Sequence, residues 1–199
     1  MIVEERDSVA IIRFNRPAAR NPLSVETLNA LHQAIRSLAA RAELRAVIFT
    51  GTGDVFASGA NIRELRELTP VSAREFARLG QSLMREIASM SPLTIAAVNG
   101  YCMGGGLDLA LACDVRVAAP GAVFAHPGAR LGIITGWGGT QRLPRLIGAA
   151  LAFEMFTTAR RVGSAEALEI GLVQRLCEPA LDGALLVANA QPGEQTLSE

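Results

Sequence analysis

The sequence predicts an α/β protein with a largely parallel sheet, because short apolar strands alternate with amphipathic helices along its 199 residues. Half of the residues are apolar and 19% are charged, which is typical of a globular chain. The segments AVIFTG, TIAAVNG, DVRVAAP and LVQRLCE suggest a repeated unit without exact repetition. No linker divides the chain, so we expect one core domain over residues 1–179. Residues 180–199 are expected to form a short tail, partly helical or disordered.

The individual elements follow from local patterns, beginning near the N-terminus. SVAIIRFNRP predicts a strand, since it is rich in β-branched residues and Pro17 stops pairing. SVETLNALHQAIRSLAA places its apolar residues on one face of a helix, with Ser24 as the N-cap. AVIFTG (46–51) predicts a buried strand, and residues 71–90 predict a second amphipathic helix.

The second half of the chain continues this alternation. TIAAVNG (94–100) predicts a buried strand, which a glycine loop and a helix from about residue 105 follow. DVRVAAP and AVFAHP predict short strands, whereas WGGTQRLPRLIG and LAFEMFTTA predict helices. Ser164 is expected to cap the helix AEALEIG and Gly171 to end it, before LVQRLCEP forms the last strand.

Composition excludes several classes of function. The formal net charge is zero, and no basic stripe suggests nucleic-acid binding. The first residues lack the pattern of a signal peptide, and no stretch reaches the ~18 apolar residues of a membrane span. Cys102, Cys113 and Cys177 lack metal-site spacing and are expected to be reduced thiols. We therefore expect a cytoplasmic protein that binds neither nucleic acid nor membrane and holds no metal.

The segment NGYCMGGGLDLALACD, residues 99–114, is the first candidate site. Gly104, Gly105 and Gly106 separate a predicted strand from a helix that contains Asp108. Glycines there let a ligand oxygen approach the unpaired first amides of the helix. Neither the Walker nor the dinucleotide glycine pattern is matched, and Asp108 would repel a phosphate. A thioester carbonyl that becomes an oxyanion is the ligand we favour, and tight packing without a ligand is the alternative.

The segment FASGANIREL, residues 56–65, is the second candidate site. It also follows a predicted buried strand and opens a predicted helix. Two such corners can direct two backbone amides at one oxygen, which is the requirement for an oxyanion hole. Loss of one donor from such a site typically costs about 10²–10³ in rate.

Five motifs of this chain resemble the enoyl-CoA hydratase/isomerase (crotonase) family. They lie between Ile2 and Pro179 and read RPAARNPLS, TGTGDVFASGANIREL, IAAVNGYCMGGGLDLALACDVRVAA, LGIITGWGGTQRLPRLIG and SAEALEIGLVQRL. The resemblance implies a spiral of ββα units that binds acyl-CoA thioesters and stabilises their enolate with two backbone amides. It implies a trimer or a dimer of trimers, and no cofactor besides the coenzyme A of the substrate. Family members normally continue with further C-terminal helices, whereas this chain stops soon after its last predicted strand.

The same resemblance assigns roles to residues at matching positions. It assigns the two amides to Ala60 and Gly105. The remaining contacts with the substrate are expected from Ala57, Ser58 and Ile62 beside adenine and pantetheine, Arg16, Arg20 and Arg63 at the phosphates, and Leu23 and Tyr101 at the acyl chain. Solvation of the arginines and a core role for Leu23 and Tyr101 are the alternatives.

Four positions depart from the pattern or extend it. Hydratases of the family hold and deprotonate one water with two glutamates, and this chain has Asp108 and Gly128 at those positions. Asp is one methylene shorter than Glu, and a misplacement of about an ångström can cost about 10²-fold in rate. Gly128 supplies no acid, and loss of an acid–base group typically costs about 10²–10⁴-fold. His126 is either a substitute or a hydrogen-bonded loop histidine. Trp137 either narrows the acyl pocket, where Gly128 also lies, or simply packs.

Hydration of 2-enoyl-CoA is therefore the leading interpretation of the sequence. Enoyl-CoA isomerisation and acyl-CoA decarboxylation are alternatives, because neither needs a water positioned by two acids. A catalytically degenerate protein that binds coenzyme A esters is a further alternative, favoured by the missing acid at Gly128. A serine hydrolase is disfavoured, since no G-x-S-x-G motif surrounds Ser58.

Overall fold

The computed structural model describes residues 1–190. Within that range the chain forms twelve strands in three sheets. The strands are β1 (Ile2–Arg6), β2 (Val9–Arg13), β3 (Pro22–Leu23), β4 (Ala46–Thr50), β5 (Val55–Ala57), β6 (Gly59–Ala60), β7 (Leu93–Val98), β8 (Tyr101–Met103), β9 (Val115–Ala118), β10 (Val123–Ala125), β11 (Val162–Gly163) and β12 (Arg175–Leu176).

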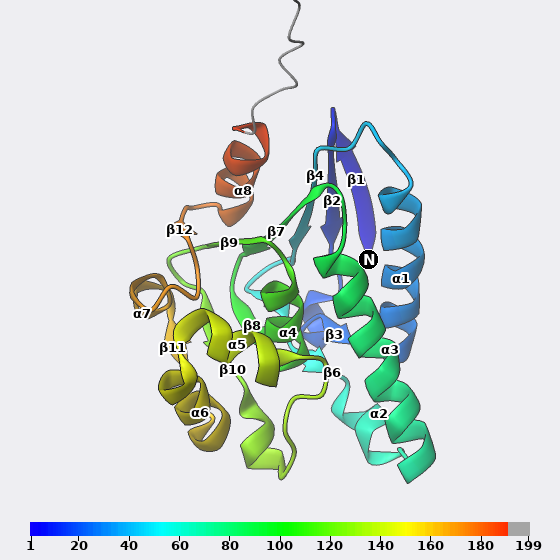
Figure 1. The fold of residues 1–199 in the computed structure, drawn as a ribbon, viewed down its shortest axis with the longest axis vertical. Helices are drawn as coiled ribbons and strands as arrows, with labels where there is room; N and C mark the ends of the chain where they lie inside the picture. The colour runs from blue at the N-terminus through cyan, green and yellow to red at the C-terminus, as the bar shows by residue number, and fades with distance from the viewer. Residues whose placement is uncertain (191–199) are drawn as a thin grey trace, which may run out of the picture.

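The helices lie between these strands, as the sequence predicts (Figure 1). The α-helices are α1 (Val25–Ala39), α2 (Ile62–Arg66), α3 (Pro70–Ala88), α4 (Gly105–Ala112), α5 (Gly139–Ile147), α6 (Ala149–Thr158), α7 (Ser164–Glu169) and α8 (Ala180–Asn189). Two 3-10 helices, η1 (Pro17–Ala19) and η2 (Pro127–Leu131), complete the elements of residues 1–190.

The main sheet has the strand order β1-β2-β4-β7-β9-β12. All of its neighbouring strands are parallel except the edge pair β1 and β2. A second sheet has the order β11-β10-β8-β5, and β3 pairs with β6 separately. The predicted α/β class with a largely parallel sheet is therefore confirmed.

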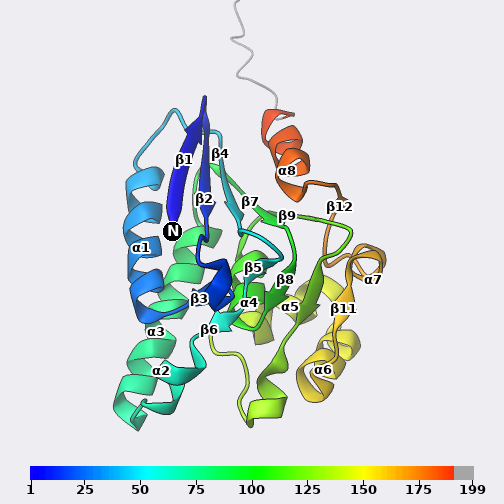
Figure 2. The ribbon, with the colours of Figure 1, turned by 180° about the vertical axis from the view of Figure 1, so that it is seen from behind.

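Alternate residues of the central strands point to opposite faces of the main sheet. Ile12 and Phe49 belong to the larger core, which they share with apolar residues of α1, α3 and α4. Ile11 and Ile48 belong to a second core, which small residues of α8 cover. Figures 1 and 2 show α1 and α3 side by side along one side of this sheet, with α8 apart from them beside β7 and β9.

Local chemistry explains most helix ends, with one correction. Ser24 caps α1 as predicted, because its hydroxyl oxygen accepts a hydrogen bond from the backbone N–H of Thr27. Ser164 does not cap α7, and the prediction that it would was wrong. Its hydroxyl group donates instead to the backbone carbonyl of Pro120, so it joins α7 to the turn before β10. The predicted last strand shortens to the two residues of β12.

The C-terminal part of the chain bears on the predicted domain boundary. Residues 180–189, predicted to lie in the tail, form α8, whose buried residues Ala180, Ala184 and Ala188 pack in the second core of the main sheet. Residues 191–199, the rest of that predicted tail, lie outside the described residues. None of the helices within residues 1–190 is long and apolar enough to cross a membrane.

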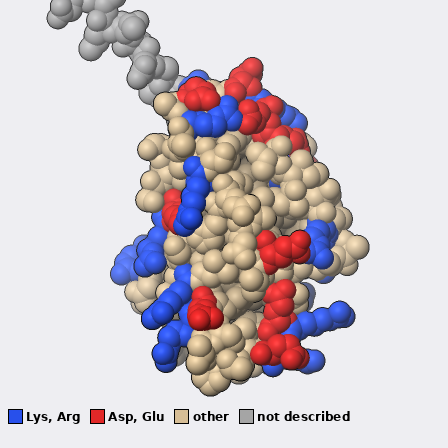
Figure 3. Space-filling model, turned by 90° about the vertical axis from the view of Figure 1, so that its right-hand side faces the viewer, with Lys and Arg blue, Asp and Glu red and all other residues tan. Residues whose placement is uncertain are grey.

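Charged side chains of both signs are intermixed on the side of the molecule formed by α1 and α3 (Figure 3). One cluster joins these two helices, since Glu86 of α3 contacts both His32 and Arg36 of α1, at 2.9 Å and 3.0 Å. The carbonyl oxygen of Leu79 lies 3.1 Å from the other ring nitrogen of His32. His32 is therefore part of the packing between two helices.

Candidate functional site

The two glycine-rich corners of the sequence meet in the structure. Gly59 precedes Ala60 in β6 and has φ +88°, a conformation that favours glycine. A Cβ atom at Gly59 would lie 2.8 Å from the amide nitrogen of Gly105 and 2.8 Å from the carbonyl oxygen of Met103. Bare backbone at this point lets the first corner approach the start of α4. The predicted proximity of the two corners is therefore present.

Each glycine of the GGG run meets a different constraint. Gly104 has φ +52°, so the chain turns there from β8 into α4. A Cβ atom at Gly105 would lie 2.3 Å from ring atom Cζ3 of Trp137, and one at Gly106 would lie 2.3 Å from the carbonyl oxygen of Ala57. The run therefore combines a turn with two close contacts, one to the indole ring and one to the neighbouring strand β5.

An inner cavity of about 430 Å³ lies against these corners. Ala60 and Gly105, the two residues predicted to supply amides, both border it. The other predicted residues that border it are Ser58, Ile62, Asp108, Gly128 and Trp137. The surrounding apolar wall includes Leu65, Leu68, Phe76 and Ile133. The cavity thus joins a mainly apolar space to one carboxyl group.

Asp108 lies in the first turn of α4 with no exposed surface. Burial raises the pKa of its carboxyl group to about 6, whereas the hydroxyl group of Thr135 and the backbone amide of Trp137 act in the lowering direction. The Thr135 hydroxyl donates a hydrogen bond to Oδ2 of Asp108. Oδ1 has no hydrogen-bond partner. The guanidinium group of Arg142 and the backbone amide of Gly139 also act in the lowering direction. A buried carboxylate with a pKa near 6 is suited to accept a proton near neutral pH.

His126 also borders the inner cavity, at the junction of β10 and η2. It is 3% exposed, and its ring lies 4.9 Å from that of Phe156, centre to centre. Neither ring nitrogen has a hydrogen-bond partner. Burial lowers the pKa of the imidazole to about 4. No protein group among residues 1–190 therefore hydrogen-bonds this ring.

Gly128 borders the inner cavity and contributes only backbone atoms to it. Its carbonyl oxygen accepts a 3.0 Å hydrogen bond from the amide of Ile133. A Cβ atom at Gly128 would lie 2.6 Å from the carbonyl oxygen of Ile133. The loop that follows η2 thus folds closely over the position at which the resemblance to the family implies a second acid, and this backbone has no room for a longer side chain there.

Trp137 forms one wall of the inner cavity and also packs, whereas its effect on an acyl chain stays a prediction. It is 4% exposed, and its ring lies 5.3 Å from that of Phe76. A Cβ atom at Gly80 of α3 would lie 2.2 Å from its ring nitrogen. The indole ring is therefore fixed between α3 and the start of α4.

An outer hollow of about 990 Å³ shares Ser58, Ala60, Ile62 and Pro127 with the inner cavity as border residues. Five arginines line it: Arg16, Arg20, Arg63, Arg130 and Arg161. Tyr101 lines it as well, with the guanidinium group of Arg20 over its ring at 4.9 Å. Arg20 also pairs with Asp54 at 3.1 Å. The hollow is therefore rich in guanidinium groups beside the narrower apolar cavity.

Two predicted contact residues do not border either space. Leu23 in β3 and Ala57 in β5 are both fully buried members of the larger core. Leu23 takes the core role that the sequence left open, and its predicted place at the acyl chain is wrong. Ala57 lies beneath the close backbone contact at Gly106, so its side chain is closed off from both spaces and its contact with the substrate stays a prediction.

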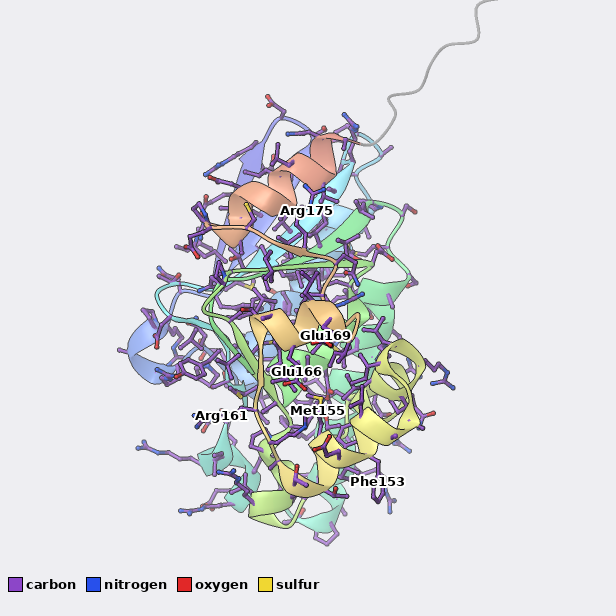
Figure 4. The ribbon with its side chains drawn as sticks, turned by 90° about the vertical axis from the view of Figure 1, so that its left-hand side faces the viewer. Phe153, Met155, Arg161, Glu166, Glu169 and Arg175 are labelled. Carbon is purple, nitrogen blue, oxygen red and sulfur yellow. The ribbon has the colours of Figure 1, made fainter. Side chains whose placement is uncertain are left out.

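Two arginines of the outer hollow escaped the sequence analysis. Arg130 comes from η2, and Arg161 lies between α6 and β11, where Figure 4 shows it. Neither residue stands in a recognisable motif, so only the fold brings them to the hollow. Within residues 1–190, no group of three or more His, Cys, Asp or Glu side chains is arranged to hold a metal ion.

Comparisons with known proteins show which family this chain resembles in sequence. A sequence model described as enoyl-CoA hydratase/isomerase matches residues 4–184. The short-chain-enoyl-CoA hydratase of Clostridium acetobutylicum is 40% identical over 181 residues, which are 90% of this chain and 69% of that protein. The crotonyl-CoA hydratase of Syntrophomonas wolfei is 42% identical over 180 residues, again 90% of this chain and 69% of that protein.

A solved structure gives the same answer for the fold. The enoyl-CoA hydratase from Bacillus anthracis superposes with a TM-score of 0.90 at 35% identity, and the match covers 94% of this chain and 74% of that chain. The crotonase fold that the sequence resemblance implied is thereby confirmed.

Proposed function

This chain belongs to the enoyl-CoA hydratase/isomerase family, and we propose that it adds water across the double bond of a 2-enoyl-CoA thioester. The observation that carries the proposal is that Ala60, Gly105 and Asp108 border one mainly apolar cavity. Relatives that are 40% and 42% identical bear the names of a short-chain-enoyl-CoA hydratase and a crotonyl-CoA hydratase. A short enoyl chain is the substrate class that these names support.

In the proposed reaction the thioester carbonyl lies at the amides of Ala60 and Gly105. Attack of water at C3 moves charge onto the thioester oxygen, and the two amide hydrogens stabilise the enolate more strongly than the starting ester. Asp108 accepts the water proton, because a carboxylate with a pKa of about 6 is mostly ionised at neutral pH. The same group then returns the proton to C2.

The coenzyme A part of the substrate occupies the outer hollow in this proposal. Guanidinium groups bind phosphate oxygens with paired hydrogen bonds, and five arginines line the hollow. Ser58 and Ile62 border both spaces, so they would flank the pantetheine chain on its way to the thioester. We propose no separate cofactor, and activity should therefore survive dialysis against a chelator.

Crotonyl-CoA provides the direct test. We expect its conjugated absorbance to fall when the protein is added, and Asp108→Asn to lower kcat by about 10²–10⁴-fold while the affinity for butyryl-CoA stays within a few-fold. Binding of crotonyl-CoA without loss of absorbance would instead indicate a non-catalytic binding protein. A gain of absorbance with 3-enoyl-CoA as the only activity would indicate an isomerase, and either result would reject the hydratase proposal.

We also propose that the protein is a cytoplasmic homo-oligomer, a trimer or a hexamer, which acts on an acyl-CoA thioester and on neither nucleic acid nor membrane. The oligomer is what resemblance to the family implies. The cytoplasmic location is supported by the free thiols of Cys102 and Cys113, which are both buried. Light scattering of the purified protein tests the first part of this proposal, and fractionation of the source cells tests the second.

A further inference from the structure

Unpaired polar groups gather at one place in the described part of the chain. Four buried side-chain nitrogen or oxygen atoms of residues 1–190 lack a hydrogen-bond partner, and three of them are Oδ1 of Asp108 and the two ring nitrogens of His126. Both residues border the inner cavity. Leaving a buried polar group unpaired costs on the order of 1–3 kcal/mol. Two such residues on one cavity therefore point to a polar molecule that enters it.

The separation of the two groups defines what could lie between them. Nε2 of His126 is 3.7 Å from Oδ1 of Asp108, which is too long for a hydrogen bond. A single water about 2.8 Å from each atom can bridge such a gap. At neutral pH the low pKa of His126 keeps its ring uncharged, while Asp108 is mostly ionised. With the ring proton on Nδ1, both facing atoms are acceptors, and water supplies two donors.

We propose that His126 is a second catalytic residue, whose Nε2 accepts one O–H of the attacking water while Oδ1 of Asp108 accepts the other. This inference rests on the proposed function and deepens it. With both hydrogens held by the protein, a lone pair of the water oxygen is free to face C3 of the substrate. The arrangement would perform the positioning that a second acid at Gly128 cannot supply here.

The proposed step balances without any further reactant. One water proton passes to Asp108 as the new O–C3 bond forms, and the electrons of the C2=C3 bond give the enolate held at Ala60 and Gly105. Asp108 then returns that proton to C2, and the thioester carbonyl re-forms. The hydrogen held by His126 stays on oxygen and becomes the 3-hydroxyl group of the product. His126 begins and ends uncharged, and Asp108 begins and ends ionised.

The packing around the pair supports this assignment of atoms. Thr135 engages Oδ2 of Asp108, so Oδ1 is the oxygen left for water. A Cβ atom at Gly139 would lie 2.1 Å from Oδ1 of Asp108 and 3.1 Å from Cε1 of His126. Bare backbone at Gly139 therefore makes room for both groups at once. The ring of Phe156, 4.9 Å away centre to centre, also packs against the imidazole.

The kinetic test compares His126→Phe with His126→Gln, and it has a matched control. The chain has two histidines, and the other one, His32, packs between α1 and α3. We expect His126→Phe to lower kcat for crotonyl-CoA by about 10²-fold, with KM and the affinity for butyryl-CoA within about twofold. His126→Gln should recover about tenfold or more of that loss, because its amide oxygen also accepts. His32→Gln should leave kcat unchanged.

A second measurement uses the unsubstituted histidine and does not depend on a variant that folds. Imidazole ¹⁵N signals are recorded by NMR, with His32→Gln to assign those of His126. We expect 3-hydroxybutyryl-CoA, whose hydroxyl group replaces the attacking water, to shift the His126 signals, and butyryl-CoA, which lacks that group, to shift them much less. A purely structural histidine would respond equally to both ligands.

The outcomes separate this inference from the proposed function. If crotonyl-CoA is not hydrated by the wild-type protein, the proposed function fails, and the NMR comparison still decides whether His126 meets a 3-hydroxyl group. If hydration occurs but His126→Phe keeps kcat within about twofold, or both ligands shift the ring signals equally, the role of His126 is overturned.

Discussion

Asp108 shows how burial of a single residue sets the pH range of the proposed reaction. Its carboxyl pKa of about 6 lies above the ordinary value because the charged form is desolvated. Only the ionised form accepts a proton, so we expect kcat for crotonyl-CoA to fall below about pH 6 and to level off above it. His126, with a pKa of about 4, does not titrate in this range. A pH profile of kcat between pH 5 and 8 measures this fall in activity at low pH.

Titration of Asp108 should also change the stability of the folded state, in the direction opposite to its effect on kcat. A carboxyl group whose pKa is raised by folding stabilises the folded state when protonated, and this contribution is lost as pH rises from about 4 through about 6. Asp108→Asn removes the titration. We therefore expect the melting temperature of the wild type, relative to this variant, to decline over that range. A constant difference, or a flat profile of kcat, would contradict the assignment of the raised pKa to Asp108.

At the scale of elements, the site depends on the approach of β6 to the start of α4. Gly59→Ala would place a methyl group 2.8 Å from the amide nitrogen of Gly105 at a φ of +88°, so the two corners must separate. We expect kcat for crotonyl-CoA to fall by about 10²-fold or more, because one amide moves away from the oxyanion. Steady-state kinetics with crotonyl-CoA measures the loss.

Gly121→Ala is the matched control for this substitution. No heavy atom lies within 4 Å of a Cβ built at Gly121, and its φ is not in the left-handed region. This variant should keep the wild-type kcat. If Gly59→Ala also keeps it while remaining folded by circular dichroism, the two corners do not form the oxyanion site.

Elements with a long repeating pattern could be predicted from the sequence, and shorter ones only in part. The apolar spacing in residues 25–39 gave α1 and its cap at Ser24, since a helical face of that length has few competing interpretations. Ser164 was predicted from a local rule, but its hydroxyl group finds the carbonyl of Pro120, 44 positions earlier. Such a partner depends on how β10 and β11 pair, which no local pattern contains.

At the scale of the whole molecule, some features of the candidate site could be predicted from the sequence, and others depend on how distant elements pack. The glycine corners could be recognised in the sequence, whereas the assignment of the two amides to Ala60 and Gly105 came from the resemblance to the family. The closeness of His126 to Asp108 could not be predicted, because it arises where the end of β10 comes near the start of α4 in the folded chain. Leu23 shows the reverse failure, since a strand residue beside the site can face the core instead.

The predicted assembly also belongs to this scale. Phe153 on α6 is 70% exposed, and Leu168 on α7 is 42% exposed. Met155, two positions after Phe153 in α6, is fully buried and faces the core instead. Figure 4 shows α6 and α7 on the same side of the molecule. Exposed aromatic side chains are typical of interfaces between protein chains. We therefore expect this side to meet another copy, and light scattering to give three or six times the 21.0 kDa of one chain.

Phe153→Asp tests this interface, because a carboxylate buried between copies would cost more than the apolar contact it replaces. We expect the variant to shift toward a lower mass at micromolar concentration. Val71→Asp is the control, since Val71 is 69% exposed on α3, away from α6 in Figure 1. Equal masses for wild type and Phe153→Asp would exclude α6 from the interface, and a wild-type mass of one chain would reject the oligomer itself.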